Sequence, residues 1–427
     1  MRFSIATPTH NLTYLNDLYQ SLLEQHFTDW EWVLCLNGGV SVPEFSDPRV
    51  RIIVAVDQSG VGALKRFTCD QCLGEYIVEV DHDDILTDDA LTKIDAAINE
   101  SNADFLYSDS AEFRATGESN VYSEKFGWEH YKWPYKDHEY TINKTFPLTA
   151  RSLCEIFYAP NHVRVWRADT YRDVGGHDAS LQVCDDFDLV VRTYLSGAKF
   201  HLVPEPLYLY RFHLDGGNTF LKHNGDIQTT QQVVGDKYRH QLVQEWCKRE
   251  GLPMYDLGGA HNKTLGYLSV DLVDADIKAD IRHGLPFGDN TVGCLRAYDF
   301  LEHVPSCGIA QCDTGTGHHM GCTVKAMNEI YRVLVPGGWF LTSTPSTDGR
   351  GAWMDPTHAS GWSVPNSFFY HTRSYQQRFI RGLKTRFQMV RATNGFPTPW
   401  HETHNIVYGN ADMVALKDQR CPGIKEI

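Results

Sequence analysis

Three carboxylates stand within the four residues Asp81 to Asp84, directly after the apolar run Tyr76 to Val80. Such a run predicts a buried strand, and open α/β sheets bind ligands beyond the carboxyl ends of their strands. Neighbouring carboxylates repel one another unless a cation lies between them, and Mg²⁺ or Mn²⁺ prefers hard oxygen ligands. The cluster therefore predicts a divalent metal site that neutralises a diphosphate. The alternative interpretation is a helix N-cap followed by a solvated turn.

A second acidic group, Asp185 to Asp188, precedes an apolar stretch that is typical of a helix. A carboxylate placed opposite a leaving group can take the proton of an attacking hydroxyl. Asp185 and Asp186 are the candidates for such a base. A cluster that only caps the helix is the alternative.

Two cations, Lys65 and Arg66, follow a glycine-containing turn at Gly60 to Gly62. Cations and backbone N–H groups in such a turn favour phosphate. We expect both side chains to bind the donor, although a solvated helix face would show the same pattern.

The elements that position these groups alternate between strand and helix patterns along residues 1 to 110. This alternation predicts a mostly parallel α/β sheet. Strands are expected at Arg2 to Ala6, Trp32 to Leu36, Val50 to Val54 and Tyr76 to Val80, and helices at Tyr14 to Gln25 and Gly62 to Cys72. Residues 111 to 150 are aromatic and irregular in pattern, and the lysine-containing segment Lys125 to Lys144 is interpreted as a solvated loop.

The alternation restarts after a glycine- and asparagine-rich linker at Leu214 to Asn224 and a helix at Ile227 to Arg249. We therefore predict two α/β domains, residues 1–213 and 253–427, joined by a linker and helix over 214–252. Strands of the second domain are expected to begin at Pro253 and to recur at Leu268 to Val270, Val292 to Tyr298, Trp339 to Thr344, Phe387 to Asn394 and Asp412 to Leu416.

Several ordered motifs surround the first acidic cluster. They are Ala6 to Asn11, Asp29 to Val33, Gly60 to Arg66, Gly74 to Ile77, Gly175 to Asp178 and Tyr208 to His213. Together with the two acidic groups they resemble the family 2 glycosyltransferases of the GT-A fold, over residues 1 to 213. The resemblance implies a nucleoside diphosphate sugar as donor and a hydroxyl as acceptor.

The same resemblance implies roles for individual residues. Asp83 would be the metal ligand, with Asp81 on the metal or the ribose and His213 completing the metal shell. Arg211 would contact the diphosphate, and Pro8 lies in the nucleotide loop. Asp186 would be the general base that takes the proton of the acceptor hydroxyl in an inverting transfer, with Asp185 as the second candidate. Asn37 stands where the family has an acidic pair that reads the base. Because an amide both donates and accepts, uridine is only the default donor nucleotide.

The second predicted domain carries a different series, which includes Asp299 to Val304, Met327 to Gly338 and Asp355 to His358. It resembles the class I S-adenosylmethionine-dependent methyltransferases, which have a Rossmann-like fold. The resemblance implies that S-adenosylmethionine would be held by Asp256, Gly258, Gly259, Asp271, Asp280 and Asp299. The family's glycine pattern is incomplete, because Gly258 and Gly259 are followed by Ala260 and His261. Active methylation of the product and a retained acceptor-positioning scaffold both stay open, with Asp299 and His303 as candidate bases.

Cysteines are scattered and odd in number, 11 in all. Cys307, Cys312 and Cys322 lie with two histidines in an insertion, at a spacing irregular for structural zinc. Cys69 and Cys72 form a C-x-x-C within a predicted helix, where packing of small thiols is expected. With no export signal or run of 18 apolar residues, we expect a reduced cytoplasmic protein without a transmembrane anchor.

The formal net charge of −15 over 427 residues gives no footprint for nucleic acid or anionic membrane. The leading hypothesis is thus a two-domain enzyme that glycosylates a glycan or glycolipid. A viral enzyme acting on hydroxymethylated DNA bases and a non-catalytic nucleotide-sugar-binding scaffold are the alternatives. Oligomeric state is not predicted by the sequence.

Overall fold

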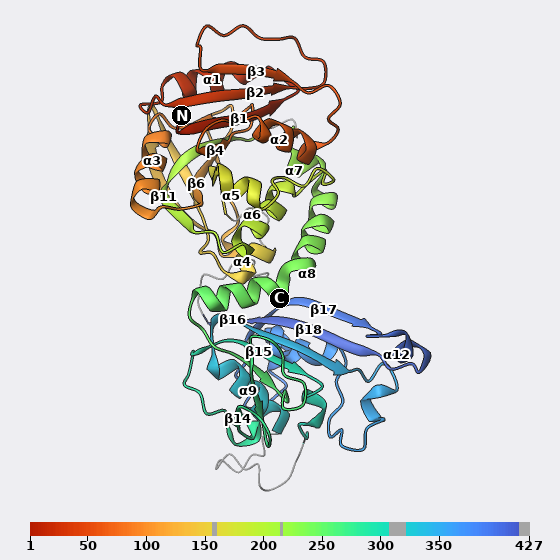
Figure 1. Ribbon diagram of the computed structural model, residues 1–427. Helices are drawn as coiled ribbons and strands as arrows, with labels where there is room; N and C mark the ends of the chain where they lie inside the picture. Colours follow the sequence, from red (N-terminus) through yellow and green to blue (C-terminus); the bar gives the residue numbers. More distant parts are fainter. Residues whose placement is uncertain (156–159, 214–216, 307–321, 418–427) are drawn as a thin grey trace. The chain divides into compact units, whose positions relative to one another are not determined.

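The computed structural model describes residues 1–155, 160–213, 217–306 and 322–417 (Figure 1). The chain divides into two compact units, Met1–Leu242 and Val243–Ile427. The division falls within the long helix α8 (Asn224–Arg249). Both units are mixed α/β, as the alternating pattern predicts.

The first unit is built on one twisted sheet with the strand order β3-β2-β1-β4-β10-β6-β11-β5. Its first four strands are parallel, whereas β10 runs antiparallel to both of its neighbours. The strands are β1 (Phe3–Thr9), β2 (Trp30–Leu36), β3 (Val50–Val54), β4 (Tyr76–Glu79), β5 (Ile85–Leu86), β6 (Phe105–Phe113), β10 (Arg164–Arg167) and β11 (Phe200–Arg211). The predicted strands are confirmed here, to within a few residues at their ends.

Helices cover both faces of this sheet. Tyr76 and Val78 of β4 join a buried apolar cluster with α1 (Leu15–Leu23) and α3 (Ala90–Ser101). Glu79 points to the other face, because side chains alternate along a strand, and there it meets Lys65 of α2 (Val61–Asp70). The other helices of the unit are α4 (Ala150–Glu155), α5 (Ala168–Asp173), α6 (Asp185–Leu195) and α7 (Thr219–Lys222).

The interpretation of residues 111 to 150 as irregular is wrong. β8 (Glu129–Tyr135) and β9 (His138–Lys144) form a hairpin, and β9 pairs with β6. The strand β7 (Ser119–Asn120) and the short helix η1 (Glu124–Phe126) precede it. Its aromatic residues pack with Tyr140 and Ile142 against the sheet. Lysines of the hairpin pair with glutamates across the strands, as Lys144 does with Glu129 at 3.0 Å, so the segment is no solvated loop.

The second unit has a seven-stranded sheet in the order β14-β13-β12-β15-β16-β18-β17. All neighbouring pairs are parallel except those of β18 with β16 and β17. The strands are β12 (Met254–Leu257), β13 (Leu268–Asp271), β14 (Ile277–Lys278), β15 (Val292–Tyr298), β16 (Leu334–Pro345), β17 (Phe387–Gly395) and β18 (Tyr408–Ala415). The order reverses between β12 and β15, which is where doubly wound sheets bind ligands.

Helix α9 (Cys322–Val333) covers this second sheet with Ala326, Met327 and Ile330 in its core. The remaining helices are short: α10 (Phe369–Thr372), α11 (Ser374–Gln377), α12 (Pro399–Thr403), η2 (Ile281–His283), η3 (Leu301–His303), η5 (Gly351–Trp353) and η6 (Asn366–Phe368).

The predicted packing role of Cys69 and Cys72 is confirmed, because both thiols are buried and free. Of the insertion that carries Cys307 and Cys312, residues 307–321 lie outside the described residues. Within the described ranges, none of the helices has the length and apolar character needed to cross a bilayer.

Candidate functional site

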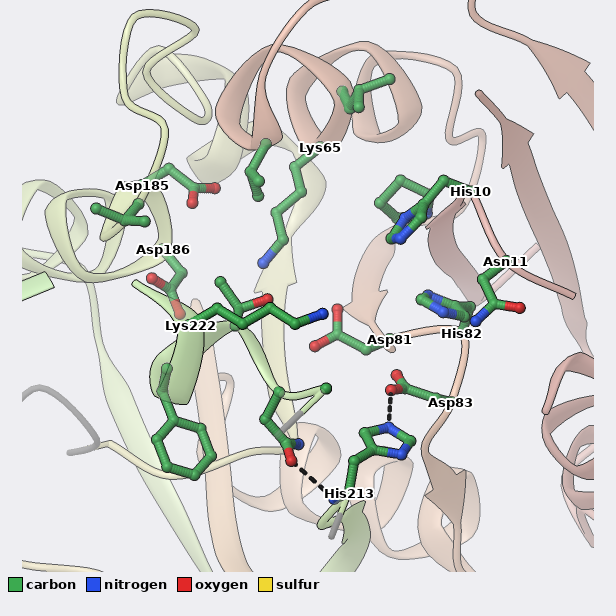
Figure 2. A pocket seen from close by; sticks show the side chains of 18 of the residues that line it. His10, Asn11, Lys65, Asp81, His82, Asp83, Asp185, Asp186, His213 and Lys222 are labelled. Atoms are coloured by element: carbon green, nitrogen blue, oxygen red, sulfur yellow. Dashed lines mark hydrogen bonds and ion pairs between the residues drawn. The ribbon is translucent and has the colours of Figure 1, made fainter. Parts of the chain in front are cut away.

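A cavity of about 480 Å³ opens at the carboxyl edge of β1, β2 and β4 (Figure 2). This is where the order of the parallel strands reverses, so the fold brings several loops to one point. Eight of the residues predicted from the sequence line it: Pro8, Asn37, Lys65, Asp81, Asp83, Asp185, Asp186 and His213.

Two predicted metal ligands are in contact on one wall of this cavity. His213 Nε2 lies 2.7 Å from Asp83 Oδ2, and the backbone N–H of His213 donates to Asn218 Oδ1 at 2.7 Å. The Asp81 carboxylate points into the cavity next to Asp83 (Figure 2). Burial raises the pKa of Asp81 to about 6, against the attraction of Lys65. Hard oxygen and imidazole ligands are therefore gathered on this wall.

The third carboxylate of the cluster, Asp84, has a structural role. It is buried and accepts hydrogen bonds from the Tyr208 hydroxyl at 2.7 Å and the Arg211 backbone N–H at 2.6 Å. Burial, together with the neighbouring Asp83 and Asp81, raises its pKa well above the usual value. Asp84 thus holds β11 against the acidic loop and leaves the cavity to the other two carboxylates.

A chain of buried charged and polar groups runs beneath the opposite wall. Lys65 Nζ forms an ion pair with Glu79. Glu79 Oε2 lies 3.6 Å from His177 Nε2, and His177 Nδ1 lies 2.7 Å from Asp185 Oδ2. Burial alone would lower the pKa of Lys65, but the attraction of Glu79 and Asp185 raises it well above its usual value. Lys65 therefore stays cationic at the cavity.

The predicted base, Asp186, lies next to this chain at the start of α6. It forms an ion pair with Arg164, whose Nε and Nη2 also donate to the Pro160 carbonyl at 3.1 and 3.0 Å. Burial opposes its ionisation, but Arg164 holds the pKa of Asp186 below its usual value. The Asp186 side chain is 15% exposed, whereas that of Asp185 is 4% exposed and turned to His177. Asp186 is thus the more accessible carboxylate of the pair.

Two predicted donor-binding residues lie outside the lining of this cavity. Arg66 forms an ion pair with Asp70 at 3.8 Å on the solvent face of α2, and its side chain is 46% exposed. Arg211 donates from Nε to the Asp83 carbonyl and from Nη2 to Asp17 Oδ2, both at 2.8 Å. Its guanidinium therefore stabilises the backbone of the loop Asp81 to Asp84 and does not line the cavity.

The cavity also contains cationic and imidazole groups that the sequence did not single out. The rings of His10 and His82 meet edge to face, with centroids 5.4 Å apart. Lys222 of α7 reaches toward Asp81 (Figure 2). His162 lines the wall beside Asp186, and burial, reinforced by Arg164, lowers its pKa to about 3. No sequence motif marks His162 or Lys222, the second of which lies in the predicted linker.

In the second unit, most of the residues predicted to hold a methyl donor follow neighbouring strands. Gly258 and Gly259 follow β12, Asp271 ends β13 and Asp299 follows β15, so they share one sheet edge. Asp299 Oδ1 accepts from the Tyr408 hydroxyl at 2.7 Å and lines a second cavity of about 620 Å³.

Two other predicted residues are engaged within the protein. Asp256 is buried in β12, where its Oδ2 accepts from Thr264 Oγ1 at 2.7 Å and Arg296 Nη1 at 2.6 Å. Asp280 pairs with Arg282 at 2.6 Å at the start of η2. Asp280 and Oδ2 of Asp256 are thus satisfied without a ligand, whereas Oδ1 of Asp256 is buried without a hydrogen-bond partner among the described residues.

The turn after β12 is closely covered. Gly258 has φ +79°, and a Cβ placed on it would lie 2.9 Å from Cδ2 of Phe300. The Phe300 ring thus fills the space beside the glycine turn.

Residues 4–157 match the model of the family described as glycosyl transferase family 2. The first unit contains a family 2 glycosyltransferase domain. The chain is 26% identical to the chondroitin synthase of Escherichia coli over 264 residues, which cover 59% of this chain and 33% of that protein. It is 24% identical to the uncharacterised protein y4gI of Sinorhizobium fredii over 223 residues, 49% of this chain and 22% of that protein. The chain thus spans about a third or less of the length of these relatives.

Among solved structures, residues 1–349 of TarS from S. aureus align with 62% of this chain and 76% of that chain. The sequence identity is 17% and the TM-score is 0.39.

Proposed function

We propose that the chain is an inverting, metal-dependent GT-A glycosyltransferase that moves a sugar from a nucleoside diphosphate donor to an acceptor hydroxyl. One observation carries the proposal. One cavity is lined by residues of the matched segment 4–157 and by residues that follow it in the chain. Asp81, Asp83 and His213 lie on one wall of this cavity, and Asp186 lies on the other. This separation matches what an inverting transfer requires, with the leaving group and the base on opposite sides of the sugar.

Asp83 and His213 would hold Mn²⁺ or Mg²⁺, with Asp81 on the metal or on the donor ribose. The close approach of Asp83 to His213 and the mixed carboxylate and imidazole ligands fit such an ion. The ion would supply positive charge at the diphosphate. Lys65, which stays cationic at the same cavity, would add to that charge.

Asp186 would take the proton. As the acceptor oxygen bonds to the anomeric carbon, the bond from that carbon to the phosphate oxygen breaks and its electron pair leaves with the diphosphate. The acceptor proton passes to the Asp186 carboxylate, which Arg164 keeps ionised and in place. Asp185 is the second candidate, but its contact with His177 turns it toward the interior.

Uridine is the first donor nucleotide to test. Asn37 lines the cavity, and its amide can pair with more than one base, so other nucleotides follow in the same test. Glycans and glycolipids are the acceptor class that we favour. Hydroxymethylated DNA bases are the alternative acceptor class. The alternative function is a scaffold that binds the donor without turnover.

For the second unit we propose a cofactor-binding, methyltransferase-like role in support of the first. Numbered along the unit, its strands have the order 3-2-1-4-5-7-6, which begins with the doubly wound order 3-2-1-4-5. Asp271 and Asp299 at the sheet edge suit the polar groups of S-adenosylmethionine. The Phe300 ring lies against Gly258, so the residues present fit S-adenosylmethionine only in part. We therefore assign no methyl-transfer step. Methylation of the product and positioning of the acceptor remain the two forms of this proposal.

The test is a donor panel with the full chain, Mn²⁺ and glycan, glycolipid and hydroxymethylated-DNA acceptors, in which nucleoside diphosphate release and product anomeric configuration are measured. We expect inverted product that disappears on chelation and in both Asp83→Ala and Asp186→Ala. Unchanged turnover in both variants would reject the site. Donor binding without turnover under every condition would favour the scaffold. A parallel thermal-shift measurement with S-adenosylmethionine tests the second unit.

A further inference from the structure

We propose that Glu302, His303 and His358 form a binding site for a divalent transition-metal ion of the Zn²⁺ type in the second unit. One ligand atom of each residue lies within 4.8 Å of those of the other two. Among the described residues, these form the one such group of three. The site is separate from the glycosyltransferase cavity and does not depend on the proposed transfer.

The fold brings the three residues to a place where a ligand is expected. Glu302 and His303 belong to η3, which follows β15 directly at the point where the strand order reverses. His358 comes from a separate segment that is fastened to η3. The backbone N–H groups of Ala359 and Ser360 donate to the Glu302 carbonyl at 2.7 and 3.0 Å. Both ligand-bearing segments are therefore held in register before any ion binds.

Glu302 provides the strongest single observation. The residue is 1% exposed, and its Oε2 accepts a hydrogen bond from Thr344 Oγ1 at 2.8 Å. Its Oε1 is buried and has no hydrogen-bond partner among the described residues. A buried polar atom without a partner costs about 1–3 kcal/mol, and more where it is charged. A cation at this position would supply the missing partner.

The two histidines are oriented as metal ligands usually are. His303 Nδ1 lies 3.3 Å from the Thr357 carbonyl oxygen, and His358 Nδ1 lies 2.9 Å from that of Ala352. A carbonyl accepts only, so His358 Nδ1 carries the proton in its contact. His303 Nδ1 also lies 3.2 Å from Thr357 Oγ1, but that hydroxyl donates to Asp355 Oδ1 at 2.6 Å and so accepts from His303, whose Nδ1 carries the proton as well. This leaves Nε2 with the lone pair, the arrangement in which an outer hydrogen bond fixes the tautomer of a ligating histidine.

The ligand types select the class of metal. Two imidazoles with one carboxylate suit Zn²⁺ and its first-row neighbours better than Ca²⁺ or Mg²⁺. Three protein ligands leave a coordination position open, as in catalytic rather than structural zinc sites. That position would be taken by water or by an oxygen of a molecule bound at the sheet edge.

The test compares the zinc content of the full chain after equilibration in a zinc buffer. The variants are His303→Gln/His358→Gln, Asp83→Asn/His213→Gln and, as a matched control, His401→Gln/His404→Gln on α12 and at its C-terminal end. We expect the first variant to hold about one equivalent less than wild type, because one ion takes all three ligands. The His401→Gln/His404→Gln control should hold as much zinc as wild type. Asp83→Asn/His213→Gln removes the metal ligands proposed for the first cavity, so any zinc that it loses is counted separately from the equivalent lost in the first variant. Equal zinc in the first variant and wild type, or no zinc in wild type, would overturn the proposal.

Cobalt distinguishes this site from thiolate ligands elsewhere in the chain. Co²⁺ bound to nitrogen and oxygen shows only weak visible bands, whereas thiolate ligation adds an intense near-ultraviolet charge-transfer band. We expect the weak bands to be lost in Glu302→Gln, with an unchanged far-ultraviolet circular dichroism spectrum to verify folding. If the thiolate band accounts for all of the bound cobalt, the assignment to these three residues is wrong.

Discussion

His213 Nε2 lies 2.7 Å from Asp83 Oδ2, although 130 residues separate the two in the chain. The contact is made because β11, which ends just before His213, carries Tyr208 and Arg211 onto Asp84 of the same acidic loop. Two side chains suited to one cation thus meet through the pairing of strand and loop.

The first prediction concerns this pair. His213→Gln is expected to raise the Mn²⁺ concentration needed for half-maximal transfer by at least about 10-fold, as loss of a group around a bound metal usually does. Titration of transfer activity with Mn²⁺ measures it. His223→Gln is the matched control, because that histidine is 53% exposed. An unchanged Mn²⁺ requirement in His213→Gln would remove the histidine from the metal shell.

The second prediction separates the two candidate bases. Asp186→Asn is expected to lower kcat by about 10²–10⁴-fold, the usual contribution of a general base, while donor binding stays near wild type. Steady-state kinetics and calorimetric titration of the donor measure the two quantities. Asp169→Asn, whose side chain is 86% exposed, controls for loss of a charge in this unit. If Asp185→Asn instead shows the larger loss of kcat at unchanged stability, the assignment passes to Asp185.

Local patterns predicted the strands and the placement of the acidic groups at their ends, since burial and period are encoded in neighbouring residues. They could not predict which carboxylates of Asp81 to Asp84 face the cavity and which one has a structural role. Asp84 differs from its neighbours only because Tyr208 and Arg211 reach it from β11. Long-range pairings of this kind leave no trace in the local sequence.

The hairpin of β8 and β9 was missed for a related reason. Its strands are rich in charged residues, and Lys144 and Glu129 satisfy one another only once the strands pair. The sequence likewise places His177 only within the motif Gly175 to Asp178, whereas in the folded chain it lies between Glu79 and Asp185. In both cases the partners that give the residues their roles are distant in sequence.

The third prediction concerns the buried ion pair of Lys65 and Glu79. Lys65→Met leaves the Glu79 carboxylate buried without its main partner, which typically costs about 3–5 kcal/mol. The double variant Lys65→Met/Glu79→Gln removes both charges and should recover a large part of that loss. The unfolding transition of the first unit in denaturant measures the change in the free energy of unfolding. Lys199→Met, at an exposed position, is the control. A loss as large in the double variant as in the single one would contradict the prediction.

The fourth prediction concerns Glu112, a buried residue of β6 that does not line the cavity. Burial raises its pKa to about 7, against hydrogen bonds from Tyr122 and Asn120. The folded state therefore binds this proton more tightly than the unfolded state, in which the carboxyl titrates near its usual value. Its contribution to stability is present in full below about pH 4 and is lost as pH rises through 7.

Glu112→Gln cannot ionise, so its free energy of unfolding should lack this loss. The variant is expected to gain about 3 kcal/mol relative to wild type between about pH 4 and pH 8, since each pKa unit is worth about 1.4 kcal/mol. Unfolding midpoints of the two proteins at a series of pH values measure the difference. Glu118→Gln, at an exposed position two residues before Asn120 of β7, is the control. A wild-type-minus-variant difference that stays constant with pH would show that the pKa of Glu112 is the same in the folded and unfolded states, so that Tyr122 and Asn120 offset burial.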